Sequence, residues 1–462
     1  MLVLSLTLGL QLALADSTPT KRWYGLAVDG VRTGYAYDEH IATPNGSTVR
    51  EAIVIEVRQL GHRSRIETLV ELQRNAADQP IAFEYKSSAG PVHNAWRGTI
   101  ESGRMHIQPL AWHSGNESTV PLTPDVALTP DRAEQFGSLL KEQQSALTFQ
   151  AFDPASQSSV STKAERVGHD DLHQVRVTRG RTSEDIWFEP SGAIARIESR
   201  AFGGKLTWTP CASDCDAPIE QPIDPMDHLI VRSPVQIFVS AKKRTLRYVI
   251  ARTDDARPLL ALTAEQNVVF DGDRAVVTIC NTCGDEESAN ATDVQRYLAP
   301  NAWVRSDDAE IHRLALATVP RGASVDFRMR KLTTTVMQRM HGSNDFLGYA
   351  DAVTALHTGS GDCTEFAVLL AALARAQGIP ARVVVGLAYS SRFSGREHVF
   401  SPHMWVQAYD GKKWKSYDAA LDGFDSTHIA FAVGNGEPQE VDTAFAQLPV
   451  LRIEKAAAVR EN

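Results

Sequence analysis

Residues 361–366 read Gly361-Asp362-Cys363-Thr364-Glu365-Phe366, and an apolar run follows them as far as Gly378. The glycine predicts a turn that places a lone cysteine on the first turn of a buried helix. The N–H groups at a helix N-terminus are unpaired and carry about half a positive charge, which favours the thiolate form of such a cysteine. This pattern indicates a nucleophile, and the alternative is a buried structural cysteine. A nucleophilic cysteine needs partners within hydrogen-bond reach, so the rest of the chain has to supply them.

The best partners lie in residues 403–418, which are typical of two strands joined at Asp410-Gly411. A two-residue loop there would pair Tyr409 with Lys412 and place His403 directly opposite Asp418. Their Cβ atoms would then be about 4.5–5.5 Å apart on one face, and a longer loop would keep them near neighbours. Taken singly, either residue could be structural. Together they predict an imidazole oriented by a carboxylate, which is the arrangement that activates a cysteine.

These motifs resemble the bacterial transglutaminase-like superfamily over about residues 301–455. The resemblance lies in Gly361-Asp362-Cys363-Thr364-Glu365, in residues 372–384 around Gly378-Ile379-Pro380, in His403-Met404-Trp405-Val406 and in residues 414–418. It implies a papain-like α+β core, a triad of Cys363, His403 and Asp418, and acyl transfer through a thioester. The reaction would be either amide cross-linking or the hydrolysis of peptide, isopeptide or amide bonds. Relatives usually continue Asp-Pro after the triad carboxylate, whereas this chain continues Asp418-Ala419-Ala420.

An oxyanion hole is the remaining requirement of such a site. The backbone N–H of Cys363 is one natural donor. Tyr349 and His357, which precede the cysteine loop, are candidates for a second donor. His398 lies near His403 in the sequence but has no carboxylate at hairpin distance, so we interpret it as a loop or substrate-pocket residue.

Composition restricts the remaining possibilities. The 462 residues suggest two to four domains, and 43% apolar with 22% charged residues describe a soluble globular protein. The net charge of −9 gives no basic surface for nucleic acid or anionic membranes.

Residues 1–15 are apolar and end in Ala13-Leu14-Ala15, which predicts a signal peptide, although no Lys or Arg precedes the run. A membrane anchor is the alternative. We expect an exported chain, periplasmic or secreted, without stable membrane insertion after cleavage.

The other four cysteines form two close groups, Cys211-x3-Cys215 and Cys280-x2-Cys283. In an exported protein they would most simply form two disulfides, which leaves Cys363 as the unpaired thiol. The alternative is a zinc site made of four thiolates.

The fold class that we predict is multidomain. An antiparallel β-rich domain at 16–216 is followed by a linker at 217–225 and by a small β-sandwich-like domain at 226–296, with strands at 235–239, 245–250 and 275–280. The α+β papain-like, transglutaminase-like domain spans 297–455. It should contain helices at 309–319 and 325–340, the Cys363 helix, a strand at 381–389 and a loop at 390–402.

The function predicted from the sequence is that of an exported cysteine-dependent acyl-transfer enzyme, either a protease or amidase or a transglutaminase. It would need no cofactor or metal and would act on a protein or peptide substrate in the cell envelope. Two alternatives stay open. One is a non-catalytic envelope module that binds peptides or supports assembly. The other is a zinc protein organised by the four paired cysteines.

Overall fold

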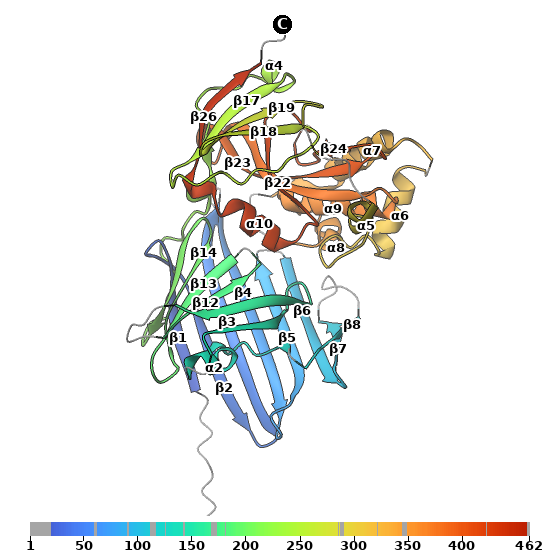
Figure 1. Cartoon of the computed structure of the whole chain (residues 1–462). Coiled ribbons are helices and arrows are strands. Elements are labelled where there is room, and N and C mark those ends of the chain that lie inside the picture. The colour runs from blue at the N-terminus through green and yellow to red at the C-terminus, as the bar shows by residue number, and fades with distance from the viewer. Residues whose placement is uncertain are drawn as a thin grey trace, which may run out of the picture.

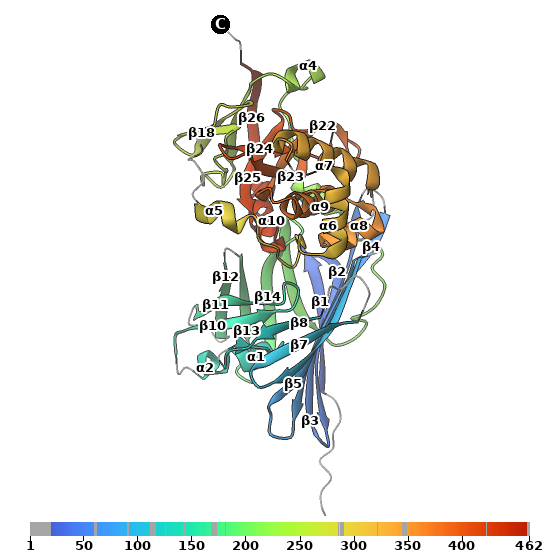
Figure 2. The same ribbon diagram turned by 90° about the vertical axis from the view of Figure 1, so that its right-hand side faces the viewer.

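The computed structural model of the chain is strand-rich, as predicted (Figure 1). It describes residues 20–59, 62–89, 92–110, 117–124, 126–141, 144–167, 173–180, 182–284, 286, 291–320, 322–343, 349–421 and 423–459. The predicted signal peptide at 1–15 lies outside these residues. Figures 1 and 2 show a large N-terminal sheet and, above it, a mixed C-terminal part. No helix within the described residues is long and apolar enough to cross a membrane.

The N-terminal sheet contains fifteen strands in the order β8-β7-β6-β5-β4-β3-β2-β1-β15-β14-β13-β12-β11-β10-β9. Neighbours are antiparallel except β9 and β10, which are parallel. The strands are β1 (Thr20–Val28), β2 (Val31–Thr43), β3 (Gly46–Gln59), β4 (His62–Asn75), β5 (Pro80–Ala89), β6 (Val92–Glu101), β7 (Arg104–Pro109), β8 (Ser118–Pro121), β9 (Val126–Ala127), β10 (Ala146–Asp153), β11 (Ser158–Arg166), β12 (His173–Arg179), β13 (Thr182–Phe188), β14 (Ile194–Ala201) and β15 (Gly204–Cys211).

Local sequence explains these strands. In β1, Tyr24, Leu26 and Val28 are buried while the residues between them are more exposed, which is the period of two of a sheet with one covered face. Asp29 and Gly30 join β1 to β2 with φ values of 48° and 83°. Two consecutive positive φ angles are what a two-residue hairpin turn requires, and Asp-Gly adopts them readily.

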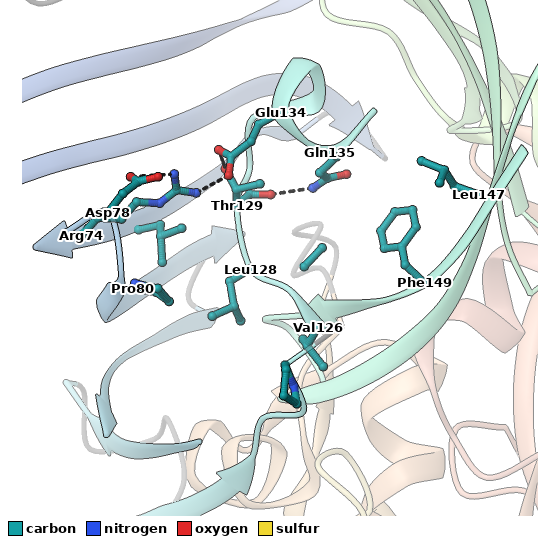
Figure 3. A pocket seen from close by; sticks show the side chains of 13 residues that line it. Arg74, Asp78, Pro80, Val126, Leu128, Thr129, Glu134, Gln135, Leu147 and Phe149 are labelled. Carbon is teal, nitrogen blue, oxygen red and sulfur yellow. Dashed lines mark hydrogen bonds and ion pairs between the residues drawn. The ribbon is translucent and has the colours of Figure 1, made fainter. Parts of the chain in front are cut away.

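The N-terminal sheet curls around two short helices, α1 (Arg132–Gln135) and α2 (Gly137–Leu140). Phe136 and Leu139 are fully buried in one core with residues from both halves of the sheet. The two edge strands, β8 and β9, follow each other in the chain. Beside β9 lies a cavity of about 440 Å³, lined by apolar side chains such as Leu128 and Phe149 and by a polar group around Arg74 (Figure 3).

The C-terminal part contains two larger sheets and one short pair of strands. The first sheet has the order β16-β23-β22-β25, with β24 paired to β23, and the second has the order β18-β19-β17-β26. Their strands are β16 (Val231–Arg232), β17 (Leu246–Arg252), β18 (Gln266–Asp271), β19 (Arg274–Ile279), β22 (Ala381–Phe393), β23 (Arg396–Tyr409), β24 (Trp414–Tyr417), β25 (His428–Gly434) and β26 (Leu451–Ala458), and the short pair is β20 (His341–Gly342) with β21 (Ser360–Gly361).

The helices of this part are α3 (Met226–Leu229), α4 (Val239–Lys242), α5 (Ala291–Arg296), α6 (Ala309–Thr318), α7 (Val325–Arg339), α8 (Ala352–Thr358), α9 (Cys363–Ala376) and α10 (Pro438–Phe445), with a 3-10 turn η1 (Leu448–Val450). Helix α10 faces the N-terminal sheet (Figure 2), and its Gln439 Nε2 donates to Asp153 Oδ2 at 3.1 Å. Helix α9 is the central element, because every residue from Glu365 to Ala376 is buried.

One hydrophobic core joins α9 to both larger sheets, including Tyr248, Val277 and Leu451. The small sandwich that we expected at 226–296 is therefore not self-contained. Its strands β17, β18 and β19 form a sheet with β26, from the end of the sequence, and bury their apolar face against α9 and its neighbours. The predicted strand at 235–239 is wrong, since Phe238 and Val239 are exposed and α4 begins at Val239.

The predicted loop at 390–402 is also wrong, because β22 and β23 continue to a tight turn at Ser394-Gly395. Both turn residues have positive φ, 48° and 73°. The hairpin register at Asp410 differs too: Tyr409 pairs with Trp414 rather than Lys412. The Asp410 carboxylate accepts hydrogen bonds from Lys412 N and Lys413 N at 2.8 and 2.9 Å, which stabilises a longer loop.

Candidate active site

Helix α9 starts with a capping box that fixes the position of Cys363. The Asp362 carboxylate accepts a hydrogen bond from Thr364 N at 2.7 Å, and Glu365 Oε2 accepts one from Asp362 N at 2.9 Å. Gly361 is needed for this arrangement, since a Cβ at this position would lie 2.5 Å from Glu365 Cβ. The first turn of α9 is therefore held by local hydrogen bonds and by close packing.

Cys363 is a free, partly buried cysteine. Burial, followed by the negative charge of Asp362, raises the pKa of the Cys363 thiol well above its usual value, while a hydrogen bond from the backbone of Met404 acts in the opposite direction. The thiolate that we expected at the helix N-terminus is therefore opposed by burial and by the surrounding carboxylates, which favour a protonated resting thiol.

His403 and Asp418 form a buried pair. His403 Nε2 lies 2.7 Å from Asp418 Oδ2, and their side chains are 6% and 1% exposed. The two residues meet although the hairpin register differs from the expected one. The pairing shifts by an even number of residues, and an even shift keeps side chains on the same face of a strand.

The other oxygen of Asp418 is also occupied. Oδ1 accepts hydrogen bonds from Ala420 N at 2.8 Å and Leu421 N at 3.2 Å. Ala419 stands where relatives usually have proline. This difference does not affect either donor, because both N–H groups belong to later residues. Burial alone would raise the pKa of Asp418, but its interaction with His403 and the hydrogen bonds from His403 and His428 hold it well below its usual value. Asp418 is therefore a carboxylate.

His428 is a site residue that the sequence interpretation missed. Its Nε2 lies 2.9 Å from Asp418 Oδ2, the oxygen that also contacts His403, and its side chain is 1% exposed. His428 reaches Asp418 because β25 pairs with β22, a long-range contact. The only local signal is the spacing Asp425-x-x-His428, which is too common to identify a site.

His403, Asp418 and His428 are also the one group of the described residues whose donor atoms gather closely enough to hold a metal ion, all within 4.8 Å of one another. In this arrangement both Nε2 atoms instead contact the Asp418 carboxylate. The four remaining cysteines form two disulfides, Cys211–Cys215 and Cys280–Cys283, and so do not make the alternative zinc site of four thiolates.

The other residues proposed from the sequence form hydrogen bonds with other partners. The Tyr349 hydroxyl donates to the Gly436 carbonyl at 2.8 Å, and His357 Nε2 lies 2.6 Å from Glu310 Oε2. Each group therefore has a partner outside the His403–Asp418 pair. His398 Nδ1 lies 3.0 Å from the Tyr389 hydroxyl, away from Asp418.

The thiol and the His403–Asp418 pair lie on adjoining elements. Helix α9 packs against β23, and the Thr364 hydroxyl donates to the Met404 sulfur at 3.4 Å. Together with the Met404 backbone contact, this places the Cys363 sulfur beside the residue that follows His403. Both Cys363 and His403 belong to the described part of the chain, and no hydrogen bond joins them in this structure.

Beside the carboxylate, a cavity of about 720 Å³ lies between α7 and β24. Asp418 and Phe424 form part of its wall, together with an ionic network in which Asp326 contacts Arg330 and Lys415. The site therefore has a polar, mixed-charge cavity on the carboxylate side.

A cysteine at a helix start and a histidine–aspartate pair on neighbouring strands are the residue types that cysteine nucleophiles use. The C-terminal part carries a transglutaminase-like domain, because residues 319–419 match the model of the Transglutaminase-like superfamily. The comparison with curated proteins gives no match.

Solved structures show distant similarity. A proposed cysteine protease from Cytophaga hutchinsonii is 17% identical with a TM-score of 0.30, and the match covers 47% of this chain and 86% of that chain. The periplasmic domain of TgpA from Pseudomonas aeruginosa is also 17% identical with a TM-score of 0.30, over 60% of this chain and 93% of that chain. Since these scores are low, the assignment rests on the family match and on the residues of the site.

Proposed function

We propose that the chain is a cysteine-dependent acyl-transfer enzyme that acts on amide or peptide bonds through a thioester. Cys363 is the nucleophile, His403 the general base and acid, and Asp418 the residue that orients His403. The observation that carries this proposal is the buried pair of His403 Nε2 and Asp418 Oδ2 at 2.7 Å, formed within a transglutaminase-like domain next to the residue whose backbone contacts the Cys363 thiol.

The chemistry follows from the protonation states. His403 Nε2 is engaged by Asp418, which leaves Nδ1 to take the proton of the Cys363 thiol. The sulfur attacks the substrate carbonyl carbon, and the backbone N–H of Cys363 stabilises the oxyanion. The tetrahedral intermediate collapses as His403 returns the proton to the leaving amine, and a thioester remains. Water or a second amine then attacks the thioester, His403 takes the proton of that nucleophile, and the thiol is released with the proton restored.

The resting geometry requires a small closure, because no hydrogen bond joins Cys363 to His403 before substrate binds. Catalytic hydrogen bonds often tighten only in the complex. The accompanying proposals are a papain-like α+β fold for the C-terminal part, a separate domain formed by the N-terminal sheet, and an exported protein, periplasmic or secreted. The two disulfides support export, since such bonds persist in oxidising compartments.

A second candidate is a non-catalytic envelope module that uses this fold to bind peptides. The missing Cys363–His403 hydrogen bond favours it, as does the fifteen-stranded sheet, to which the proposed reaction assigns no step.

Alkylation of Cys363 by iodoacetamide separates the two candidates. The other cysteines are in disulfides, so Cys363 is the thiol that reacts in the native protein. An activated dyad predicts that His403→Ala lowers the alkylation rate by at least about 10-fold. His312→Ala is the matched control, because it removes a histidine from α6, outside the candidate site, and should leave the rate unchanged. Equal rates in wild type and His403→Ala would overturn the enzyme proposal.

The substrate class is then tested by intact mass. The wild-type protein, incubated with a cell-envelope extract, should acquire an acyl adduct that hydroxylamine removes and that Cys363→Ala lacks. Added primary amine separates the two reactions: incorporation into the acyl product indicates a transglutaminase, and release of free acid alone indicates a protease or amidase.

A further inference from the structure

Two histidines share one oxygen of Asp418. His403 Nε2 lies 2.7 Å and His428 Nε2 lies 2.9 Å from Oδ2, while Oδ1 is occupied by two backbone N–H groups. An orienting carboxylate normally stabilises a proton on one imidazole. Here a second imidazole competes for the same negative charge, and the proposed triad gives that residue no role.

The surroundings of His428 offer an acceptor to each ring nitrogen. Nε2 has Asp418 as its acceptor, and Nδ1 lies 3.1 Å from the Asp425 carbonyl oxygen and 3.4 Å from Asp425 Oδ1, while the Asp425 backbone N–H also approaches Nδ1, at 3.3 Å. Burial lowers the pKa of His428, but the hydrogen bonds to and charges of Asp418 and Asp425 outweigh it and raise the pKa to about 9. His428 is therefore a cation at neutral pH.

The other ionisable groups around His428 do not change this conclusion. His403 faces it edge-on with ring centroids 5.4 Å apart, and Trp405 and Phe424 cover the rest of the ring at 5.2 and 5.0 Å. The charge of His428 also acts on the buried Glu265. The Lys242 ammonium group is paired with the far side of Asp425 at 3.7 Å.

We propose that His428 is a positioning residue which, as a buried imidazolium on Asp418 Oδ2, keeps His403 in the neutral form that accepts the Cys363 proton. A second proton, on His403, would place two cations against one carboxylate, and the low dielectric of the interior makes that unfavourable. The role matters here because the resting thiol is protonated, so that a protonated His403 would leave the pair without a base. This inference rests on the proposed function of Cys363 and His403.

The test is the pH profile of Cys363 alkylation in wild type and in His428→Gln. Glutamine keeps an N–H donor for Asp418 but carries no charge, so it removes the proposed effect and retains the hydrogen bond. The alkylation rate is measured between about pH 5 and pH 9. In His428→Gln the midpoint of the fall in rate at low pH should move to higher pH by about one unit, a ten-fold change in the proton dissociation constant. An unchanged midpoint in a folded His428→Gln protein would overturn the proposal, since a purely structural role predicts no shift.

Two further variants keep the test decisive. Asp425→Asn removes a carboxylate on the far side of His428 and should shift the midpoint in the same direction by a smaller amount, and it serves if His428→Gln does not fold. His312→Ala, in α6 and outside the candidate site, should leave the midpoint unchanged. His403→Ala separates the two proposals. If it does not affect alkylation, the proposed function fails; if it slows alkylation while His428→Gln and Asp425→Asn leave the midpoint in place, only the role of His428 fails.

Discussion

At the scale of single residues, the site combines a protonated thiol with an ionised carboxylate. Burial and Asp362 hold the proton on Cys363, whereas His403 and His428 keep Asp418 charged. Cys363, His403 and Asp418 could be proposed from the sequence for local reasons. The cysteine motif is contiguous, and the spacing of the hairpin keeps His403 and Asp418 on the same face. His428 could not, because its approach to Asp418 depends on which strand pairs with β22.

Stability should depend on pH through His428. Hydrogen bonds to Asp418 and Asp425 raise the pKa of His428 from its ordinary 6.5 to about 9 in the folded chain, so the folded state binds the proton more tightly. The contribution is complete below pH 6.5, is lost as the pH rises through about 9, and amounts to about 3 kcal/mol at most. Urea unfolding at these two pH values should show the loss in wild type and a smaller loss in His428→Gln. An equal loss in both proteins would assign the dependence to another group.

At the scale of elements, α9 was predictable and the hairpins around it were only partly so. The glycine turn at Gly361 and the end of the apolar run at Gly378 are local signals, and α9 forms where they predict it. The Asp410 loop differs because a side-chain hydrogen-bond pattern, not the Asp-Gly dipeptide alone, sets its length. The strand expected at 235–239 has the right residue types, but α4 begins within it and its apolar side chains remain exposed.

The start of α9 should tolerate no side chain at residue 361. Gly361→Ala would place a Cβ against Glu365 and should destabilise the protein by roughly 1–3 kcal/mol. Gly342→Ala is the matched control. Gly342 pairs with Gly361 between β20 and β21, but a Cβ there meets nothing within 4 Å. Thermal unfolding of both variants measures the difference, and similar melting temperatures would contradict the packing argument.

At the scale of the whole molecule, the C-terminal core is assembled from distant segments. Tyr248 and Leu451 lie in the same core as α9, although β17 and β26 stand far apart in the sequence. Because we assigned domains from consecutive stretches of the sequence, we predicted a small separate sandwich at 226–296. The partner strand β26 could not be assigned to it, since nothing local in residues 451–458 specifies their pairing with β17.

The last strand should accordingly stabilise the region around the thiol. Leu451→Ala, at a fully buried position, should cost roughly 2–5 kcal/mol. Arg452→Ala, at the neighbouring exposed position, should cost little. Differential scanning calorimetry measures both changes, and iodoacetamide labelling of Cys363 near the melting temperature should rise earlier in Leu451→Ala. Labelling that is unaffected by Leu451→Ala would show that β26 does not support the site.

The position of β26 also has a consequence for biosynthesis. The core around α9 includes Leu451 and Ile453, so a nascent chain on the ribosome lacks part of that core until those residues have been made. Pairing across such a long stretch of sequence is slow compared with local folding. The core around Cys363 is therefore completed late, after the ribosome has passed the cysteine by almost ninety residues, where β26 begins.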